Sequence, residues 1–224
     1  LCILSFLLVL YSTFLTRIGI LGETSVHAFT DLGMSGQLIF YMLFFVILAV
    51  VMLAINWKKI PKENSDDSIT SREFWMFIGM LVLCISAIQI TFTTSIPVIN
   101  KIFGSNLAPP VDVKEHFNSW QMPIAMIIAL LMAVGQFFKY KESKPKEVFK
   151  KLLFSLIIST ILSVVLILLL KFNSIHYMVL LFTAVFAIIA NFDYFLRVLK
   201  GKFSFSGASI AHIGFAFILL GTLI

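Results

Sequence analysis

Apolar runs of about 20 residues recur along the chain, and this is the length that a helix needs to cross about 30 Å of hydrocarbon. Hydrophobic residues make up 60% of the chain and charged residues only 12%, whereas soluble domains carry roughly 25% charged residues. A chain with so little polar surface is not expected to stay in water, which excludes soluble enzymes and nucleic-acid-binding proteins. We therefore predict an all-α, polytopic transmembrane helix bundle surrounded by membrane lipid.

Hydropathy divides the chain into about seven spans, which we interpret as a single transmembrane domain over residues 1–224. The expected spans cover residues 1–16, 36–56, 74–96, 119–138, 151–171, 177–196 and 207–224. Leu1 and Ile224 each stand within an apolar run, so we expect an internal or C-terminal fragment of a longer protein. The first run lacks the basic segment and the cleavage site of a signal peptide.

The connections between the expected spans alternate in charge. Those at residues 57–73, 139–151 and 197–206 hold 13 of the 17 Lys and Arg residues. Short loops rich in Lys and Arg stay on the cytoplasmic side of a membrane, and this explains the net charge of +6 without a nucleic-acid partner. The connections predicted to face the outside are residues 17–35, 97–118 and 172–176.

His212 is the most informative ionisable residue, because ionisable side chains inside a bilayer are functional candidates by default. It lies in the last expected span, where Gly207, Ala211, Gly214 and Gly221 recur at helical spacing and leave one face nearly bare. Such a face serves close helix packing. A neutral imidazole beside it also suits axial ligation of a flat macrocycle, because iron needs a nitrogen and the ring needs space. Both interpretations remain open on these residues alone.

The other candidates have weaker patterns. His27 lies in a partly apolar, aromatic outside loop, His116 in a stiff segment of mixed charge, and His176 in a tight turn. Asp193 lies near the inner end of its expected span, from which its carboxylate can reach water. The two cysteines form no Cys-x-x-Cys pattern, and the sequence contains no nucleotide loop, nucleophile elbow or zinc-type spacing.

Three stretches resemble signatures of a known family. Residues 14–29 (Phe-Leu-Thr-Arg-Ile-Gly-Ile-Leu-Gly-Glu-Thr-Ser-Val-His-Ala-Phe) are similar to a stretch of the CcmF family, in which Thr-x-Leu-x-Arg-Ser-Gly-x-Leu leads into Ser-Val-His-Ala-Phe. Pro109-Pro110 with Phe117-Asn118 resembles a Pro-Pro-x-Phe-Asn element, and residues 211–214 (Ala-His-Ile-Gly) resemble Ala-His-Leu-Gly. Ile18 departs from the family's usual Ser. On these motifs the chain resembles the CcmF-type cytochrome c haem lyase subunit, within the CcmF/CcsA haem-handling family.

The resemblance implies a membrane subunit of the cytochrome c maturation haem lyase. Such a subunit receives haem from the chaperone CcmE and reduces it through a membrane-embedded haem b with electrons from quinol. It promotes covalent attachment of the transient haem substrate to apocytochrome c, beside a CcmH-type thioreductase subunit that binds the apocytochrome. Enzyme activity is expected only as part of this complex, in the bacterial inner membrane.

The resemblance also implies roles for individual residues. His27 is expected to be an axial ligand of the transferred haem, in a loop on the periplasmic side, and His212 an axial ligand of the membrane haem. Arg17 is expected to pair with a haem propionate. The partner ligands and a tryptophan-rich segment are expected before residue 1.

Two other functions remain open. A multi-span haem or small-molecule transporter without lyase chemistry would show substrate flux and no stable reducible haem. Broken spans with paired charges near the midplane would favour it, and the sequence shows none. A structural subunit of an assembly complex would tolerate replacement of both His27 and His212.

Overall fold

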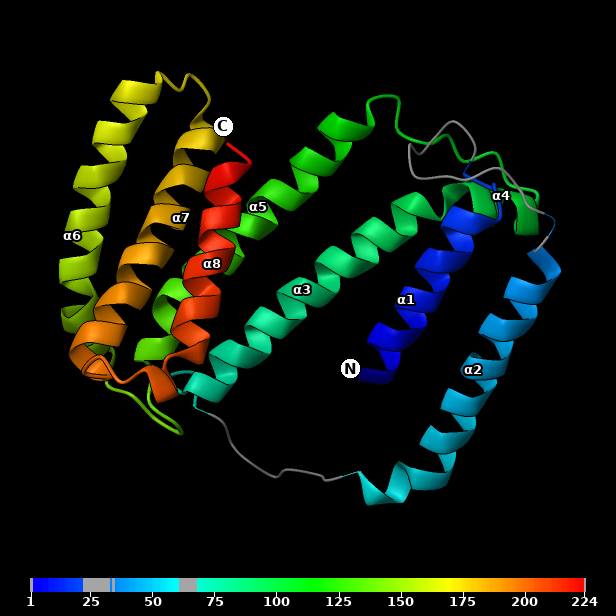
Figure 1. Cartoon of the computed structure of the whole chain (residues 1–224), viewed down its shortest axis with the longest axis horizontal. Helices are drawn as coiled ribbons and strands as arrows, with labels where there is room; N and C mark the ends of the chain where they lie inside the picture. The colour runs from blue at the N-terminus through cyan, green and yellow to red at the C-terminus, as the bar shows by residue number, and fades with distance from the viewer. Residues whose placement is uncertain (1, 22–32, 34, 61–67, 224) are drawn as a thin grey trace. The chain divides into compact units, whose positions relative to one another are not determined.

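The computed structural model describes residues 2–21, 33, 35–60 and 68–223, and these residues form helices without any strand (Figure 1). The main helices are α1 (Cys2–Arg17), α2 (Ser35–Asn56), α3 (Arg72–Thr94), α4 (Ile96–Phe103), α5 (Val113–Val134), α6 (Pro145–Leu170), α7 (Ile175–Asp193) and α8 (Gly207–Gly221). Short helical segments are η2 (Trp57–Lys59), η3 (Gly135–Phe137), η4 (Tyr194–Val198) and η5 (Phe203–Phe205). The prediction of an all-α helix bundle is confirmed.

Within the described residues, five helices are long and apolar enough to cross a membrane: α2, α3, α5, α6 and α7, the last taken together with η4. The apolar helices α1 and α8 are shorter. A helix thus lies at each of the seven expected spans. α2 has no buried residue although it is apolar all round, which fits a helix that faces lipid or other helices.

The chain divides into two compact units, residues 1–65 with 90–110, and residues 66–89 with 111–224. The core of the first unit contains Phe14 and Leu15 of α1 and Val98 of α4. The hydroxyl of Tyr11 donates a hydrogen bond to Oγ of Ser95 at 2.7 Å, which ties α1 to the start of α4. These contacts hold the short helices of this unit together.

The second unit is built around α7, against which α5, α6 and α8 all pack (Figure 1). Small side chains fill the helix contacts, and the alanines that are 0–1% exposed are Ala129, Ala133, Ala184, Ala187, Ala190 and Ala216. In lipid, apolar surface gains little from helix association, so close backbone approach over small residues supplies the packing energy. This tightly packed unit carries His212 and its partners.

Two helices begin before the spans that hydropathy indicates. α5 begins at Val113 because Asp112 caps it, accepting a hydrogen bond from the backbone N–H of Glu115 at 2.8 Å. α6 begins at Pro145, a residue that suits the first helical position. The additional turns carry charged side chains, which hydropathy assigns to loops. His116 therefore lies in α5 rather than in a connecting segment.

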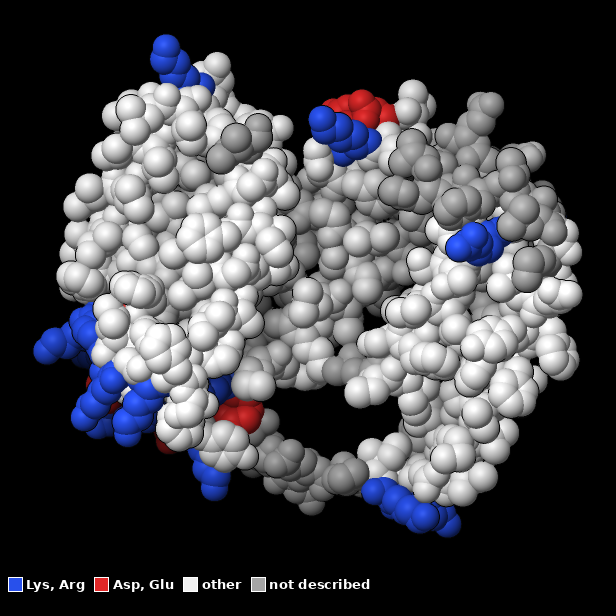
Figure 2. All heavy atoms as spheres, viewed as in Figure 1, with Lys and Arg blue, Asp and Glu red and all other residues white. Residues whose placement is uncertain are grey.

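Lys and Arg residues gather at the end of the second unit where α6 begins and α7 ends (Figure 2). Two exposed ion pairs form there, between Nζ of Lys139 and Glu147 at 3.5 Å and between Nζ of Lys144 and Glu147 at 3.9 Å. Lys114, in the first turn of α5, and Lys171, which follows α6, lie at the other end of these helices. This is the asymmetry that short basic cytoplasmic loops give to a membrane protein.

Candidate functional site

His212 belongs to a polar network that joins three helices of the second unit. Its Nδ1 lies 2.8 Å from Nε2 of Gln136, which follows α5, and 3.1 Å from Oδ1 of Asn191 on α7. Nε2 of Gln136 also donates to Oδ1 of Asn191, and Oγ of Ser209 on α8 donates to Oε1 of Gln136 at 2.8 Å. None of these three partners was predicted from the sequence. Amide and hydroxyl side chains within apolar spans mark them as candidates for such contacts, although not as partners of one another.

The imidazole of His212 is half-buried, and within the part of the chain that the structure describes no hydrogen bond reaches its Nε2. Histidines that bind metals usually hydrogen-bond through the other ring nitrogen, which fixes the ring orientation. Nε2 of His212 would therefore be the ring nitrogen that could bind a metal ion. The described residues contain no group of three or more His, Cys, Asp or Glu side chains that could hold a metal ion.

The glycine face of α8 does not adjoin His212. A Cβ added at Gly207, Gly214 or Gly221 would meet no heavy atom within 4 Å, so this face packs against none of the described helices. At 3.6 residues per turn, His212 lies about 140° around the helix from the centre of that face. The imidazole instead faces α5 and α7. The expectation that it adjoins the glycine face is therefore wrong, because the spacing of small residues does not indicate which side of α8 is packed.

Arg72, at the start of α3, fixes the backbone beside Gln136. Its Nη2 donates to the carbonyl oxygen of Gln136 at 2.6 Å, and its Nε donates to that of Phe138 at 3.0 Å. Nη2 also lies 3.4 Å from the hydroxyl of Tyr194. Carbonyls at a helix end lack helical partners, and here the guanidinium of Arg72 donates hydrogen bonds to two of them. Gln136 is therefore held at its backbone by Arg72 and at its side chain by the His212 network.

Asp193 is a buried, paired carboxylate. It is 6% exposed, and both of its oxygens accept hydrogen bonds from Arg197. Oγ of Ser155 on α6 donates to Oδ2 at 3.1 Å, and the guanidinium of Arg197 lies 4.8 Å from the ring centroid of Phe154. The expectation that this carboxylate reaches water is wrong, because the arginine one helical turn away neutralises it in place. Asp193 thus ties α7 to α6.

His116 takes part in a second polar network, between α3 and α5. Oγ of Ser86 donates to Oε1 of Gln121 at 2.6 Å, and Nε2 of Gln121 donates to Oε1 of Gln89 at 2.7 Å. Nε2 of Gln89 lies 3.3 Å from Nε2 of His116. Polar side chains within neighbouring spans satisfy one another in this way, so His116 serves helix packing.

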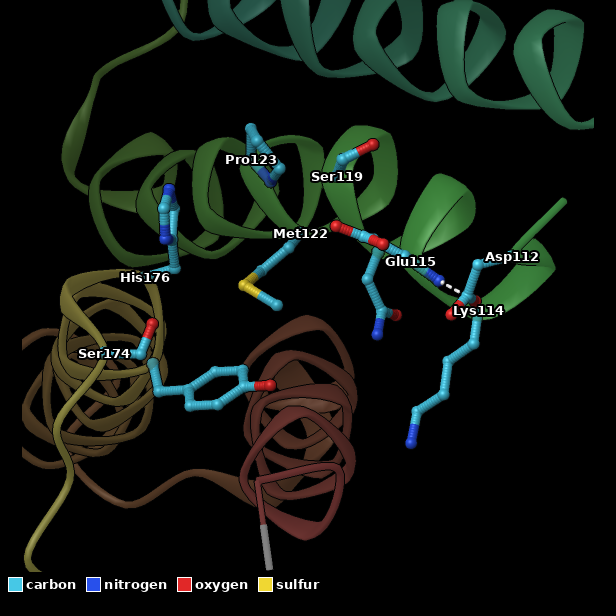
Figure 3. A pocket seen from close by; sticks show the side chains of 10 residues that line it. Asp112, Lys114, Glu115, Ser119, Met122, Pro123, Ser174 and His176 are labelled. Carbon is cyan, nitrogen blue, oxygen red and sulfur yellow. Dashed lines mark hydrogen bonds between the residues drawn. The ribbon is translucent and has the colours of Figure 1, made fainter. Parts of the chain in front are cut away.

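His176 lies at an open cleft of about 560 Å³ between the first turns of α5 and α7 (Figure 3). The lining side chains are Asp112, Lys114, Glu115, Asn118, Ser119, Met122, Pro123, Ser174, His176 and Tyr177. His176 and Lys114 lie at opposite ends of the view in Figure 3, with Met122 between them. Both charged and apolar side chains line the cleft, and neither His116 nor His212 is among them.

The remaining sequence-based site residues belong to the first unit. His27 falls within residues 22–32, which lie outside the described residues, so its role as a ligand stays a prediction. Arg17 is the exposed last residue of α1, and its pairing with a haem propionate stays a prediction as well.

Comparison with curated proteins connects the chain to a known family. It is 32% identical over 149 residues to the cytochrome c-type biogenesis protein CcmF of Pseudomonas fluorescens, and the match covers 65% of this chain. The chain is related to CcmF. The resemblance inferred from the three motifs is thus confirmed, and with the long apolar helices it makes this chain part of a multi-pass membrane protein.

The extent of the relationship to CcmF is limited. The matched part covers 21% of the Pseudomonas CcmF, so the chain spans only a small part of the length of that relative. No protein-family model matches the chain, and no solved structure matches it.

Proposed function

We propose that this chain serves cytochrome c biogenesis as part of a CcmF-type membrane subunit that handles haem. The relationship to CcmF supports this proposal, and the observation that carries it furthest is the state of His212. An imidazole in a membrane helix is held at Nδ1 by two carboxamides, while no described residue bonds to Nε2.

In this proposal Nε2 of His212 would bind the iron of a membrane-embedded haem b. The haem, when bound, supplies one-electron transfer. The imidazole lies between the carboxamides of Gln136 and Asn191 at its Nδ1 side, where α5, α7 and α8 pack together. Arg72 keeps the segment that carries Gln136 in register with α3.

The outer part of the reaction is proposed for the loop that carries His27. There, on the periplasmic side of the inner membrane, haem from CcmE would be held by His27 with Arg17 at a propionate. Quinol would supply the electrons, and apocytochrome c, presented by a CcmH-type subunit, would receive the haem. The protein's contribution is position and axial ligation, since bond formation to the cysteines of the cytochrome is chemistry of the haem itself.

Cytochrome assembly in cells tests the proposed function. In cells that lack the gene, the full-length wild-type protein is expected to restore c-type cytochromes, measured as covalently bound haem on denaturing gels. Loss of a residue that only orients a metal ligand costs about 10- to 100-fold, so His27→Ala and His212→Ala should each reduce the yield at least that much. His176→Ala is the matched control and should support normal assembly. Full assembly in both the His27 and His212 variants would contradict the proposal.

Among the described residues, the buried charged pair does not support the transporter alternative. The charged pair of Asp193 and Arg197 is local, four residues apart at the end of α7. Transporter sites instead bring charges together near the midplane at broken helices.

A further inference from the structure

Asn191 has an orientation that two backbone carbonyls fix. Its Nδ2 donates to the carbonyl oxygen of Met132 on α5 at 3.1 Å and to that of Ala187 on α7 at 2.8 Å. The side chain is 1% exposed, and an inverted amide would set its oxygen against both carbonyl oxygens. Oδ1 of Asn191 is therefore the end that meets His212.

The orientation of Gln136 follows from that of Asn191. Because Oδ1 of Asn191 can only accept, the Gln136 atom that bonds to it is the Nε2 donor. The same Nε2 lies 2.8 Å from Nδ1 of His212, while Oε1 accepts from Ser209. With Gln136 donating, Nδ1 accepts, and the one proton of the neutral imidazole lies on Nε2.

Metal binding at Nε2 of His212 requires the other tautomer. Nε2 must then offer its lone pair, so the proton of the neutral ring lies on Nδ1. Nε2 of Gln136 is a donor and cannot accept that proton, whereas Oδ1 of Asn191 lies 3.1 Å from Nδ1 and can. One proton leaves Nε2 and one is gained at Nδ1, so the charge of the ring does not change.

We propose that Asn191 is the positioning residue of the His212 site, and that Gln136 holds His212 in its unliganded state. This inference rests on the proposed function and adds to it a separate role for each of the two amides. When a metal occupies Nε2, Asn191 accepts the Nδ1 proton and Gln136 gives up its contact with Nδ1. Gln136 thus competes with metal binding, because its hydrogen bond stabilises the tautomer that cannot ligate.

The test compares Asn191→Leu with Gln136→Leu in the full-length protein, using haem as the probe. Asn191→Leu is expected to weaken haem binding about 10- to 100-fold. It should also raise the midpoint potential of the haem that remains, because an imidazole whose N–H has no acceptor donates less electron density to iron. Gln136→Leu should bind haem at least as tightly as the wild type. Thr183→Val is the control, since it removes a buried α7 hydroxyl that, among the described residues, bonds within its own helix to the carbonyl of Leu180.

Three results would overturn the assignment. The first is a greater loss of haem in Gln136→Leu than in Asn191→Leu, and the second is an unchanged midpoint potential in Asn191→Leu. The third is a loss of haem in Gln136→Leu relative to the wild type. This third result tests the assignment even if size-exclusion chromatography shows that Asn191→Leu does not fold. A wild-type protein that binds no haem would instead refute the proposed function, and this inference with it.

Discussion

The variant His212→Ala is expected to lose the membrane haem from the purified full-length protein. The described residues offer a single imidazole at this place, held at Nδ1 by Gln136 and Asn191. Removing a ligand costs more than removing the residues that orient it, which is about 10- to 100-fold. The haem content per protein, measured by the pyridine haemochromogen assay, should fall to a small fraction of the wild-type value.

The matched control for this variant is His176→Ala. His176 is an exposed histidine of the same unit, at the cleft between α5 and α7, and its removal should leave the haem content unchanged. A His212→Ala protein that keeps the wild-type haem content would show that His212 only packs the helices. Loss of haem in both variants to the same extent would also contradict the assignment.

The variant Arg197→Met is expected to be the most destabilising single change at the ion pair. It leaves the carboxylate of Asp193, which is 6% exposed, without its counter-charge. Because the Arg197 side chain is 50% exposed and solvent screens its charge, we expect a cost of about 2 kcal/mol of unfolding free energy, below that of a fully buried pair. Asp193→Asn should cost less, about 1 kcal/mol, because the remaining guanidinium can turn to water while the amide still meets Ser155.

The test compares the unfolding free energies of the two variants in detergent, and Arg197→Met is expected to lose more than Asp193→Asn. Combining Asp193→Asn with Arg197→Met should recover most of the stability lost in Arg197→Met alone, since no buried charge then remains. A result in which Asp193→Asn is the worse variant would mean that the carboxylate is not the buried partner.

Much of the fold was predictable because a membrane limits the choices. Runs of apolar residues in a lipid setting can satisfy their backbone only as helices or closed barrels, and a helix lies at each of the seven expected spans. The starts of α5 and α6 were not predictable from hydropathy. Their first turns carry charge, and helix propensity with capping by Asp112 or Pro145 decides where they begin.

The candidate site was only partly predictable. His212 stood out because an ionisable residue inside a span requires an explanation, but its direction on α8 depends on which face packs against α7. Gln136 and Asn191 lie 55 residues apart in the sequence, and nothing in their local sequence indicates that they meet. The i,i+4 spacing of Asp193 and Arg197 permits their pairing, but the pair was not predicted, and its burial depends on packing against α6.

The measurement that tests the central claim most directly is the absorption spectrum of the wild-type full-length protein. The protein would be purified in detergent from cells supplied with haem, and its spectrum recorded before and after addition of dithionite. The proposed function predicts a Soret band and b-type bands that appear on reduction, with close to one retained haem per protein. A purified, folded protein without a Soret band would contradict it.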